Sequence, residues 1–134
     1  MKKIIVYIIA LFLLLSCNSN RFISDKLHGT FNGVEFYYDE KTNRKHPLWG
    51  VKLELKQDGT CVLRKSHSLA GRYCFGEWTM VNEKLVKINC NRNPELDGIA
   101  KSLIGGNAIE GKLEVKIINK NKLKLDDVVL KRKK

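Results

Sequence analysis

Short runs of alternating apolar residues, separated by turn-forming residues, fill most of the sequence after residue 28. The clearest run places apolar residues on one face of two strands that flank an Asp-Gly turn: Val51, Leu53, Leu55, Cys61 and Leu63. A three-residue loop with Gly59 in the left-handed conformation sets Leu55 opposite Cys61 and Leu53 opposite Leu63, so these side chains all point inward. A two-residue loop would set Cys61 against Lys56, so the hydrophobic pattern selects the longer loop. Such hairpins are typical of an antiparallel barrel or sandwich.

A second hairpin follows the same pattern. Its strands flank a three-residue turn at 81–83, which sets Trp78 opposite Val86 and Cys74 opposite Cys90. The apolar residues of both strands then share one inner face.

A third hairpin joins the strands at 113–117 and 123–125. Residues 128–130 are apolar, and we expect them to extend the last strand beyond a bulge at Asp126 and Asp127.

An opening strand from Thr30 to Tyr38 carries Val34, Phe36 and Tyr38 on one face, which brings the count to seven or eight strands. One later segment has helical spacing and predicts a short helix around residues 94–104. A chain of 134 residues leaves room for one domain. Because most of its predicted elements are strands, the predicted fold class is mainly β. We expect a small antiparallel β-barrel of seven to eight strands with that helix.

The N-terminus has the pattern of an export signal. Two lysines precede twelve unbroken apolar residues, Ile4 to Leu15, and Ser16 and Cys17 follow. A membrane-spanning helix needs about 20 apolar residues. The shorter run with a charged start therefore predicts a signal peptide.

The stretch at 14–17, Leu-Leu-Ser-Cys, resembles the lipobox of bacterial lipoproteins. The resemblance implies cleavage before Cys17, a diacylglycerol thioether on its sulfur and an acyl chain, such as palmitate, on its new amino group. Two or three acyl chains hold a soluble domain on a bilayer, at about 0.8 kcal/mol for each buried methylene. The alternative is ordinary secretion with Cys17 as a cysteine of the mature domain.

The predicted organisation follows from these features: a lipoprotein signal peptide at 1–16, a lipidated tether at 17–27 and a barrel domain at 28–134. No acidic cluster follows Cys17, which favours an anchor facing the periplasm of a bacterial cell envelope.

The net charge of +11 falls to +9 when the two lysines of the leader are removed. From Lys112 to Lys134 there are nine basic and three acidic residues. Two interpretations remain open: a basic patch held close to anionic lipid, or a solvated strand face that ends in a basic tail. We expect no nucleic-acid partner, since no basic helix or aromatic stacking motif is present.

Short motifs resemble bacterial lipoproteins with a lipocalin-like barrel. Gly29, Thr30 and Phe31 are similar to a degenerate Gly-x-Trp signature, and an Asp-Gly-Thr turn at 58–60 is followed by Gly-Glu-Trp at 76–78. The resemblance implies a lipocalin-like β-barrel over about 100 residues and a ligand-binding function.

Three cysteines remain once Cys17 carries lipid. The register of the second hairpin puts Cys74 directly opposite Cys90, at a separation that a disulfide spans. The alternatives are a Cys61–Cys74 disulfide, since Cys61 shares the inner face, and three reduced, buried thiols.

We expect neither catalysis nor a metal or other cofactor. The histidines are scattered without ligand spacing, and no Cys-x-x-Cys or His-x-x-x-His occurs. No serine lies in a nucleophile elbow, and no pair of carboxylates converges.

The aromatic and apolar residues that are candidates for lining a ligand pocket are Phe36, Tyr38, Trp78 and Ile88. In the alternative interpretation they are ordinary core, because side chains can nearly fill an eight-stranded barrel. Trp49 is either a rim aromatic in a contact surface or a lid over the core.

Two hypotheses of function follow from these features. In the first, the protein is a membrane-anchored, non-catalytic module that binds a small apolar ligand or lipid. In the second, it is a lipoprotein that binds another protein, as an envelope accessory factor, a hydrolase inhibitor or an immunity protein. A cavity of a few hundred cubic ångströms would favour the first, and a filled barrel with an exposed apolar patch the second.

Overall fold

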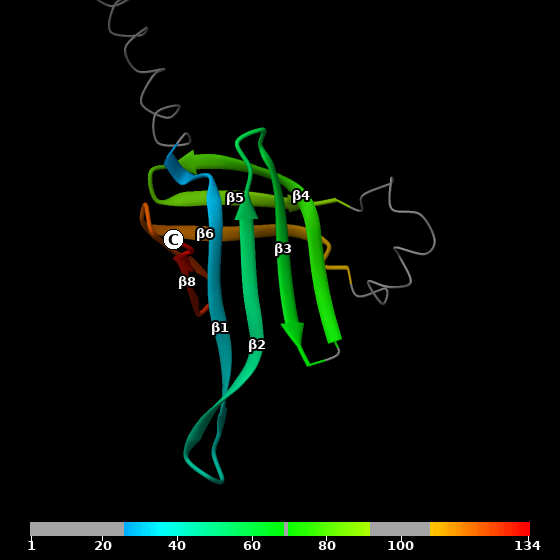
Figure 1. The fold of residues 1–134 in the computed structure, drawn as a ribbon, viewed down its shortest axis with the longest axis vertical. Helices are drawn as coiled ribbons and strands as arrows, with labels where there is room; N and C mark the ends of the chain where they lie inside the picture. Colours follow the sequence, from blue (N-terminus) through cyan, green and yellow to red (C-terminus); the bar gives the residue numbers. More distant parts are fainter. Residues whose placement is uncertain (1–25, 69, 92–107) are drawn as a thin grey trace, which may run out of the picture.

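Eight antiparallel strands form a closed barrel in the computed structural model, which describes residues 26–68, 70–91 and 108–134 (Figure 1). The strands are β1 Gly29–Asp39, β2 Arg44–Leu55, β3 Thr60–His67, β4 Ala70–Asn82, β5 Leu85–Cys90, β6 Gly111–Asn119, β7 Lys122–Leu125 and β8 Val128–Arg132. Each strand pairs with the next, and β8 pairs with β1.

This strand order is that of an up-and-down barrel, the architecture of lipocalins, so the predicted small antiparallel barrel is confirmed. The signal peptide, Cys17, most of the tether and the predicted helix at 94–104 lie outside the described residues. Among the residues that are described, no helix has the length and apolar character needed to cross a membrane.

The core lies inside the ring of strands and consists of the alternating inward-facing residues. The first hairpin has the predicted register, with Leu55 opposite Cys61 and Leu53 opposite Leu63. Among the residues that the structure describes, nine apolar residues have a relative exposure of 0%: Phe31, Leu53, Leu63, Cys74, Val86, Ile88, Val115, Leu123 and Leu130. They belong to one continuous apolar cluster, and burying each large side chain stabilises the fold by about 1.5–3 kcal/mol.

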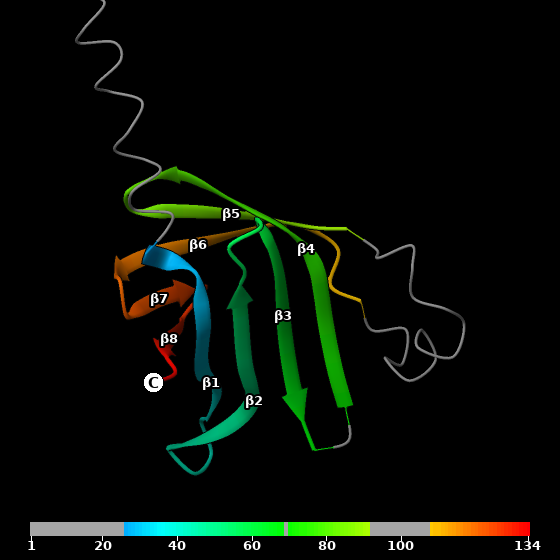
Figure 2. The same cartoon turned by 45° about the horizontal axis from the view of Figure 1, so that its top comes forward.

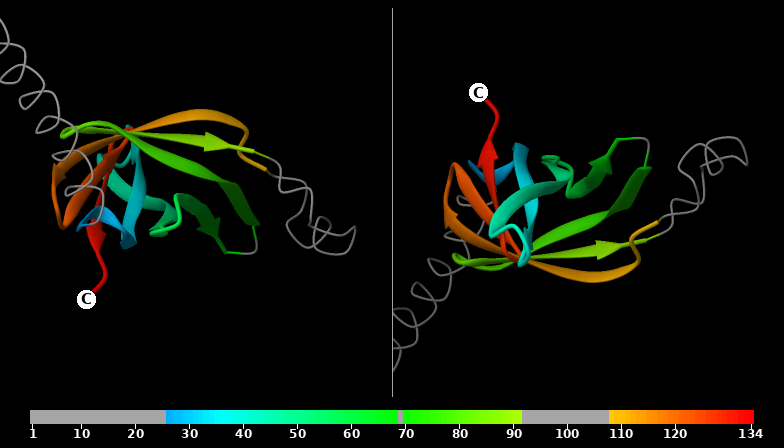
Figure 3. Two further views of the ribbon diagram at one scale, coloured as in Figure 1. Left: turned by 90° about the horizontal axis from the view of Figure 1, so that it is seen from above. Right: turned by 90° about the horizontal axis from the view of Figure 1, so that it is seen from below.

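The barrel closes along a short seam between β1 and β8 (Figures 2 and 3). Phe31 pairs with Arg132 and Asn32 with Lys131. Beyond this seam β1 crosses closely over β8 at Gly33, where a Cβ atom would lie 2.7 Å from the carbonyl oxygen of Val129. Only glycine permits this approach, after which β1 turns away from β8.

Arg132 holds the two ends of the described chain together at the seam. Its guanidinium donates hydrogen bonds to the backbone carbonyls of Lys120 (2.7 Å), His28 (2.7 Å) and Lys26 (2.9 Å). The same group lies 4.7 Å from the centroid of the Phe31 ring. A planar, five-donor guanidinium suits such a site better than an ammonium group.

The register predicted for β4 and β5 was wrong by two residues. Trp78 lies opposite Ile88, and Cys90 lies opposite Gly76 instead of Cys74. The cause is the turn: β4 continues to Asn82 through a bulge, so the loop to β5 has two residues instead of three. A shift of two leaves every side chain on its predicted face.

The bulge predicted at Asp126 and Asp127 is also wrong, because the chain reverses direction there. Leu125 pairs directly with Val128, so the two aspartates form a two-residue turn between β7 and β8. Asp126 adopts φ 51°, a left-handed conformation that aspartate tolerates because its short side chain can bond locally. The expected single long strand is therefore two strands.

Candidate functional site

The four residues predicted to line a ligand pocket do not come together. Trp78 and Ile88 face each other across β4 and β5 inside the core, and the Trp78 indole donates a hydrogen bond to the Lys56 carbonyl (2.8 Å). Phe36 and Tyr38 lie on the exterior and are about half exposed. For these two, both core burial and a place in the barrel interior are ruled out.

The cause lies in the alternation of β1. Phe31 faces the core opposite Leu53, so the even-numbered residues that follow it point outward. A bulge then interrupts the β1–β2 register between Glu35 and Phe36. Val34, Phe36 and Tyr38 do share a face, as predicted, but it is the outer one.

Beyond Gly33 the β1–β2 hairpin projects from the barrel as a two-stranded ribbon (Figure 1). We call residues 34–39 and 44–49 the aromatic ribbon. Three consecutive aromatic side chains lie on it, with exposed fractions of 55% for Phe36, 47% for Tyr37 and 53% for Tyr38. Exposed clusters of large apolar side chains are uncommon on monomers and mark contact surfaces.

Contacts at its base and along its length hold the aromatic ribbon in place. The Lys65 ammonium on β3 lies 3.2 Å from the Glu35 carboxylate in a partly buried ion pair. Farther out, the Tyr37 ring stacks on His46 with centroids 5.4 Å apart. The ribbon therefore presents its aromatic residues in a defined arrangement.

The outer edges of the aromatic ribbon carry no third strand within the described part of the chain. Pairing of β1 with β8 covers only Phe31 and Asn32, and pairing of β2 with β3 begins at Gly50. Unpaired strand edges present backbone donors and acceptors that another chain can bind.

A hollow of about 220 Å³ lies beside the first of these edges. It is lined by residues of β1, by one residue of β2, and by the β7–β8 turn with the first residue of β8: Val34, Glu35, Phe36, Tyr37, Tyr38, Lys45, Asp127 and Val128. The hollow is large enough for one side chain of a partner that follows the β1 edge.

Trp49 lies at the base of the aromatic ribbon and is half buried. Its ring meets the His67 ring edge-on at 5.7 Å, and the Arg72 guanidinium lies 5.6 Å from its centroid. Trp49 does not belong to the buried core cluster.

The predicted disulfide between Cys74 and Cys90 is confirmed, with a Cα–Cα distance of 5.2 Å. The two cysteines are diagonal neighbours on the inner face instead of direct partners. Gly76 makes this possible, since a Cβ atom there would clash with the Asn89 carbonyl and press on the Cys90 backbone. The missing side chain lets β5 approach β4.

Cys61 is the free, buried thiol among the described cysteines. Burial, with a smaller contribution from the charge of Glu77, raises the pKa of the Cys61 thiol to about 11. A thiol with so high a pKa is a poor nucleophile at neutral pH.

No group of three or more potential metal ligands occurs in the part of the chain that the structure describes. His28 and His67 are exposed, and His46 is occupied by its stacking on Tyr37.

Sequence comparisons do not assign the chain to a family: it matches no protein-family model, and no curated protein is significantly similar to it. Among solved structures, the chain is similar to a lipocalin-like protein from Bacteroides uniformis ATCC 8492. The TM-score is 0.49 at 13% identity, and the match covers 81% of this chain and 99% of the other.

The sequence interpretation missed two residues of importance. The exposure of Tyr37 could have been predicted from the sequence, because three consecutive aromatic residues on one strand cannot all face the core when side chains alternate. The role of Arg132 could not have been predicted, since the sequence does not distinguish it from its basic neighbours. Its partners, the carbonyls of Lys26 and Lys120, come close to it only in the folded chain.

Proposed function

We propose that this protein is a non-catalytic binding module that contacts a protein partner through its aromatic ribbon. Lipidated Cys17 holds it on a membrane of the bacterial cell envelope, where it faces the periplasm. The observation that carries the proposal is the exposure of Phe36, Tyr37 and Tyr38 on a projecting hairpin. Aromatic residues are enriched at protein interfaces because they bury large areas with few rotatable bonds.

The packing inside the barrel favours a protein partner over an apolar ligand in the interior. Trp78 and Ile88 pack within one apolar cluster. Neither residue lines the hollow beside the aromatic ribbon. Phe36 and Tyr38, the other two residues expected to line an interior pocket, lie on the outer surface.

The position of the tether also supports the proposal. The described chain begins at Lys26, at the end of the barrel opposite the aromatic ribbon (Figure 1). A domain attached to a bilayer through residues before Lys26 would present the ribbon away from the membrane.

Photocrosslinking in cells tests the contact. A photoreactive amino acid replaces Tyr37 in one strain and Val81, an equally exposed residue on β4, in the control strain. We expect one envelope protein to crosslink from position 37 and not from position 81, and the purified pair to bind. Equal crosslinking from both positions would contradict the proposed contact.

Matched triple variants then measure the contribution of the aromatic ribbon to the affinity for the crosslinked protein. The ribbon variant carries F36S, Y37S and Y38S, and the control carries V81S, I118S and V129S, which are exposed apolar residues elsewhere. We expect the ribbon variant to bind at least about 30-fold more weakly, the effect of a single interface hot spot of about 2 kcal/mol. The control should bind like the wild type. Native mass spectrometry that finds an apolar molecule bound in a fixed ratio would instead favour the ligand hypothesis.

Metabolic labelling with palmitate tests the anchor separately. Wild type should incorporate the label, and a Cys17→Ala variant should not. Label retained in the variant would refute lipidation at Cys17 and leave the aromatic ribbon untouched.

A further inference from the structure

Basic side chains gather at the end of the barrel where the described chain begins, which we call the anchor end. Three hairpin turns lie there, those after β2, β4 and β6, together with the end of β8. Their basic residues are Lys56, Lys84, Lys120, Lys122, Lys131, Arg132 and Lys133. Their acidic residues are Asp58 and Glu83.

The opposite end has a different balance. The turns at 39–45 and 126–127 hold three basic and four acidic residues. Among these described turns, the positive charge is therefore higher at the anchor end.

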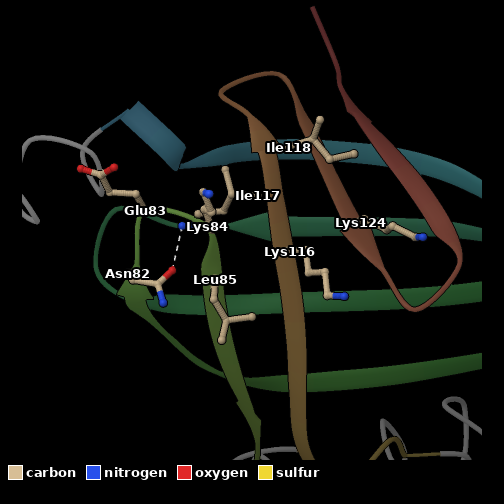
Figure 4. A pocket seen from close by; sticks show the side chains of 8 residues that line it. All are labelled: Asn82, Glu83, Lys84, Leu85, Lys116, Ile117, Ile118 and Lys124. Atoms are coloured by element: carbon tan, nitrogen blue, oxygen red, sulfur yellow. Dashed lines mark hydrogen bonds between the residues drawn. The ribbon is translucent and has the colours of Figure 1, made fainter.

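A shallow, open hollow of about 780 Å³ lies on the outer surface beside the anchor end (Figure 4). Its lining residues are Asn82, Glu83, Lys84, Leu85, Lys116, Ile117, Ile118 and Lys124. Leu85, Lys116 and Lys124 are direct neighbours in one row across β5, β6 and β7. The Lys84 carbonyl accepts a hydrogen bond from the Ile117 amide (2.8 Å), which joins the β4–β5 turn to β6.

We infer that this hollow binds the headgroup of an anionic phospholipid. Lys84, Lys116 and Lys124 supply ammonium donors for the phosphate, and each Lys near an anionic surface contributes about 1 kcal/mol. Leu85, Ile117 and Ile118 supply apolar contacts for the glycerol and the first methylenes, and Ile118 is 52% exposed.

Two acidic groups reduce this attraction without cancelling it. Glu83 lines the hollow, and the Lys124 ammonium lies 3.8 Å from the exposed Asp127 carboxylate. A solvent-exposed ion pair of this kind contributes about 0–1 kcal/mol, so Lys124 can exchange it for a phosphate. The three ammonium groups of the lining against the carboxylates of Glu83 and Asp127 leave a net charge of +1 around the hollow.

The inference rests on the proposed anchor, because the anchor brings this end of the barrel to the bilayer. Residues 17–25 span at most about 30 Å when fully extended. A tether this short keeps Lys84 and Lys116 within reach of the headgroups. The charge of the hollow and its place at the end of the barrel where the described chain begins then select the same partner, an anionic membrane surface.

Amine-reactive footprinting with mass spectrometry tests the inference on the full chain. The chain is reconstituted into nanodiscs of phosphatidylcholine alone, or of phosphatidylcholine and phosphatidylglycerol in equal parts. We expect the reactivities of Lys84, Lys116 and Lys124 to fall severalfold with phosphatidylglycerol, while those of Lys41 and Lys52, exposed elsewhere, stay constant. No change, or an equal fall at all five lysines, would overturn the inference.

Variants in which lysines are neutralised provide a second test. It measures the affinity of the full chain for a soluble short-chain phosphatidylglycerol in mild detergent. The hollow variant carries K84Q, K116Q and K124Q, and the matched control carries K41Q, K52Q and K112Q, which remove the same charge. We expect at least about tenfold weaker binding for the hollow variant alone. Equal losses in both variants, or equally tight binding of inorganic phosphate, would overturn the inference.

The outcomes keep the inference separate from the proposed function. Flotation of the chain with phosphatidylcholine vesicles depends on the anchor at Cys17 and not on the hollow. A chain that floats but shows no selective protection of Lys84 refutes the lipid site alone. A chain whose Cys17 carries no lipid, but whose hollow still selects phosphatidylglycerol, refutes the anchor alone.

Discussion

The Cys74–Cys90 disulfide should contribute a large share of the stability of this barrel. The bond closes a loop with a sequence separation of 16 residues. In the chain-entropy model, a loop of this size removes about 3 kcal/mol of conformational freedom from the unfolded state. Small domains are stable by only about 5–15 kcal/mol. Reduction of the bond should therefore lower the free energy of unfolding by about 3 kcal/mol.

Equilibrium urea denaturation, followed by tryptophan fluorescence with and without reductant, measures this difference. A variant with both Cys74→Ala and Cys90→Ala should be destabilised and should no longer respond to reductant. Cys61→Ala is the matched control, because it also removes a buried sulfur but keeps the bond, so its response to reductant should equal that of the wild type. Coincident wild-type curves with and without reductant would refute the reasoning.

Three further predictions follow from close contacts. Gly76→Ala should cost at least about 2 kcal/mol, since the new Cβ meets the Asn89 carbonyl, whereas Gly50→Ala, with no atom nearer than 3.5 Å, should change the urea midpoint little. Arg132→Met should keep the packing on Phe31 but lose the hydrogen bonds, so we expect the free energy of unfolding to fall by about 2–4 kcal/mol. An unchanged urea midpoint would contradict this prediction. Cys61, with its thiol pKa near 11, should react with iodoacetamide at pH 8 only as fast as the barrel opens, and immediate alkylation of the folded protein would exclude this burial.

The sequence was sufficient for the hairpins in which one register alone buries every apolar residue. Around Gly59 a one-residue slip would have turned Leu53 and Leu55 to solvent, so the register was determined and correct. Around Asn82 a slip of two residues exposes nothing. The pattern therefore could not separate Trp78 opposite Val86 from Trp78 opposite Ile88.

The aromatic ribbon shows where prediction from the pattern fails. Alternation indicates which residues share a face, but not whether that face is the inner one. For β1 the decision depends on Phe31 meeting Leu53 and on Gly33 crossing β8, which are contacts between distant parts of the chain. The candidate site was therefore assigned to the interior when half of its residues lie outside.

The seam between β1 and β8 has a consequence for the order in which the protein can mature. The first and last strands of the barrel meet at Phe31 and Arg132, about a hundred residues apart in the chain. A chain that crosses a membrane N-terminus first, as the proposed lipid anchor at Cys17 would require, could not close its ring until Arg132 had crossed. Before that point the β1 side of the seam would lack its partner strand, and its unpaired backbone groups would be open to other chains.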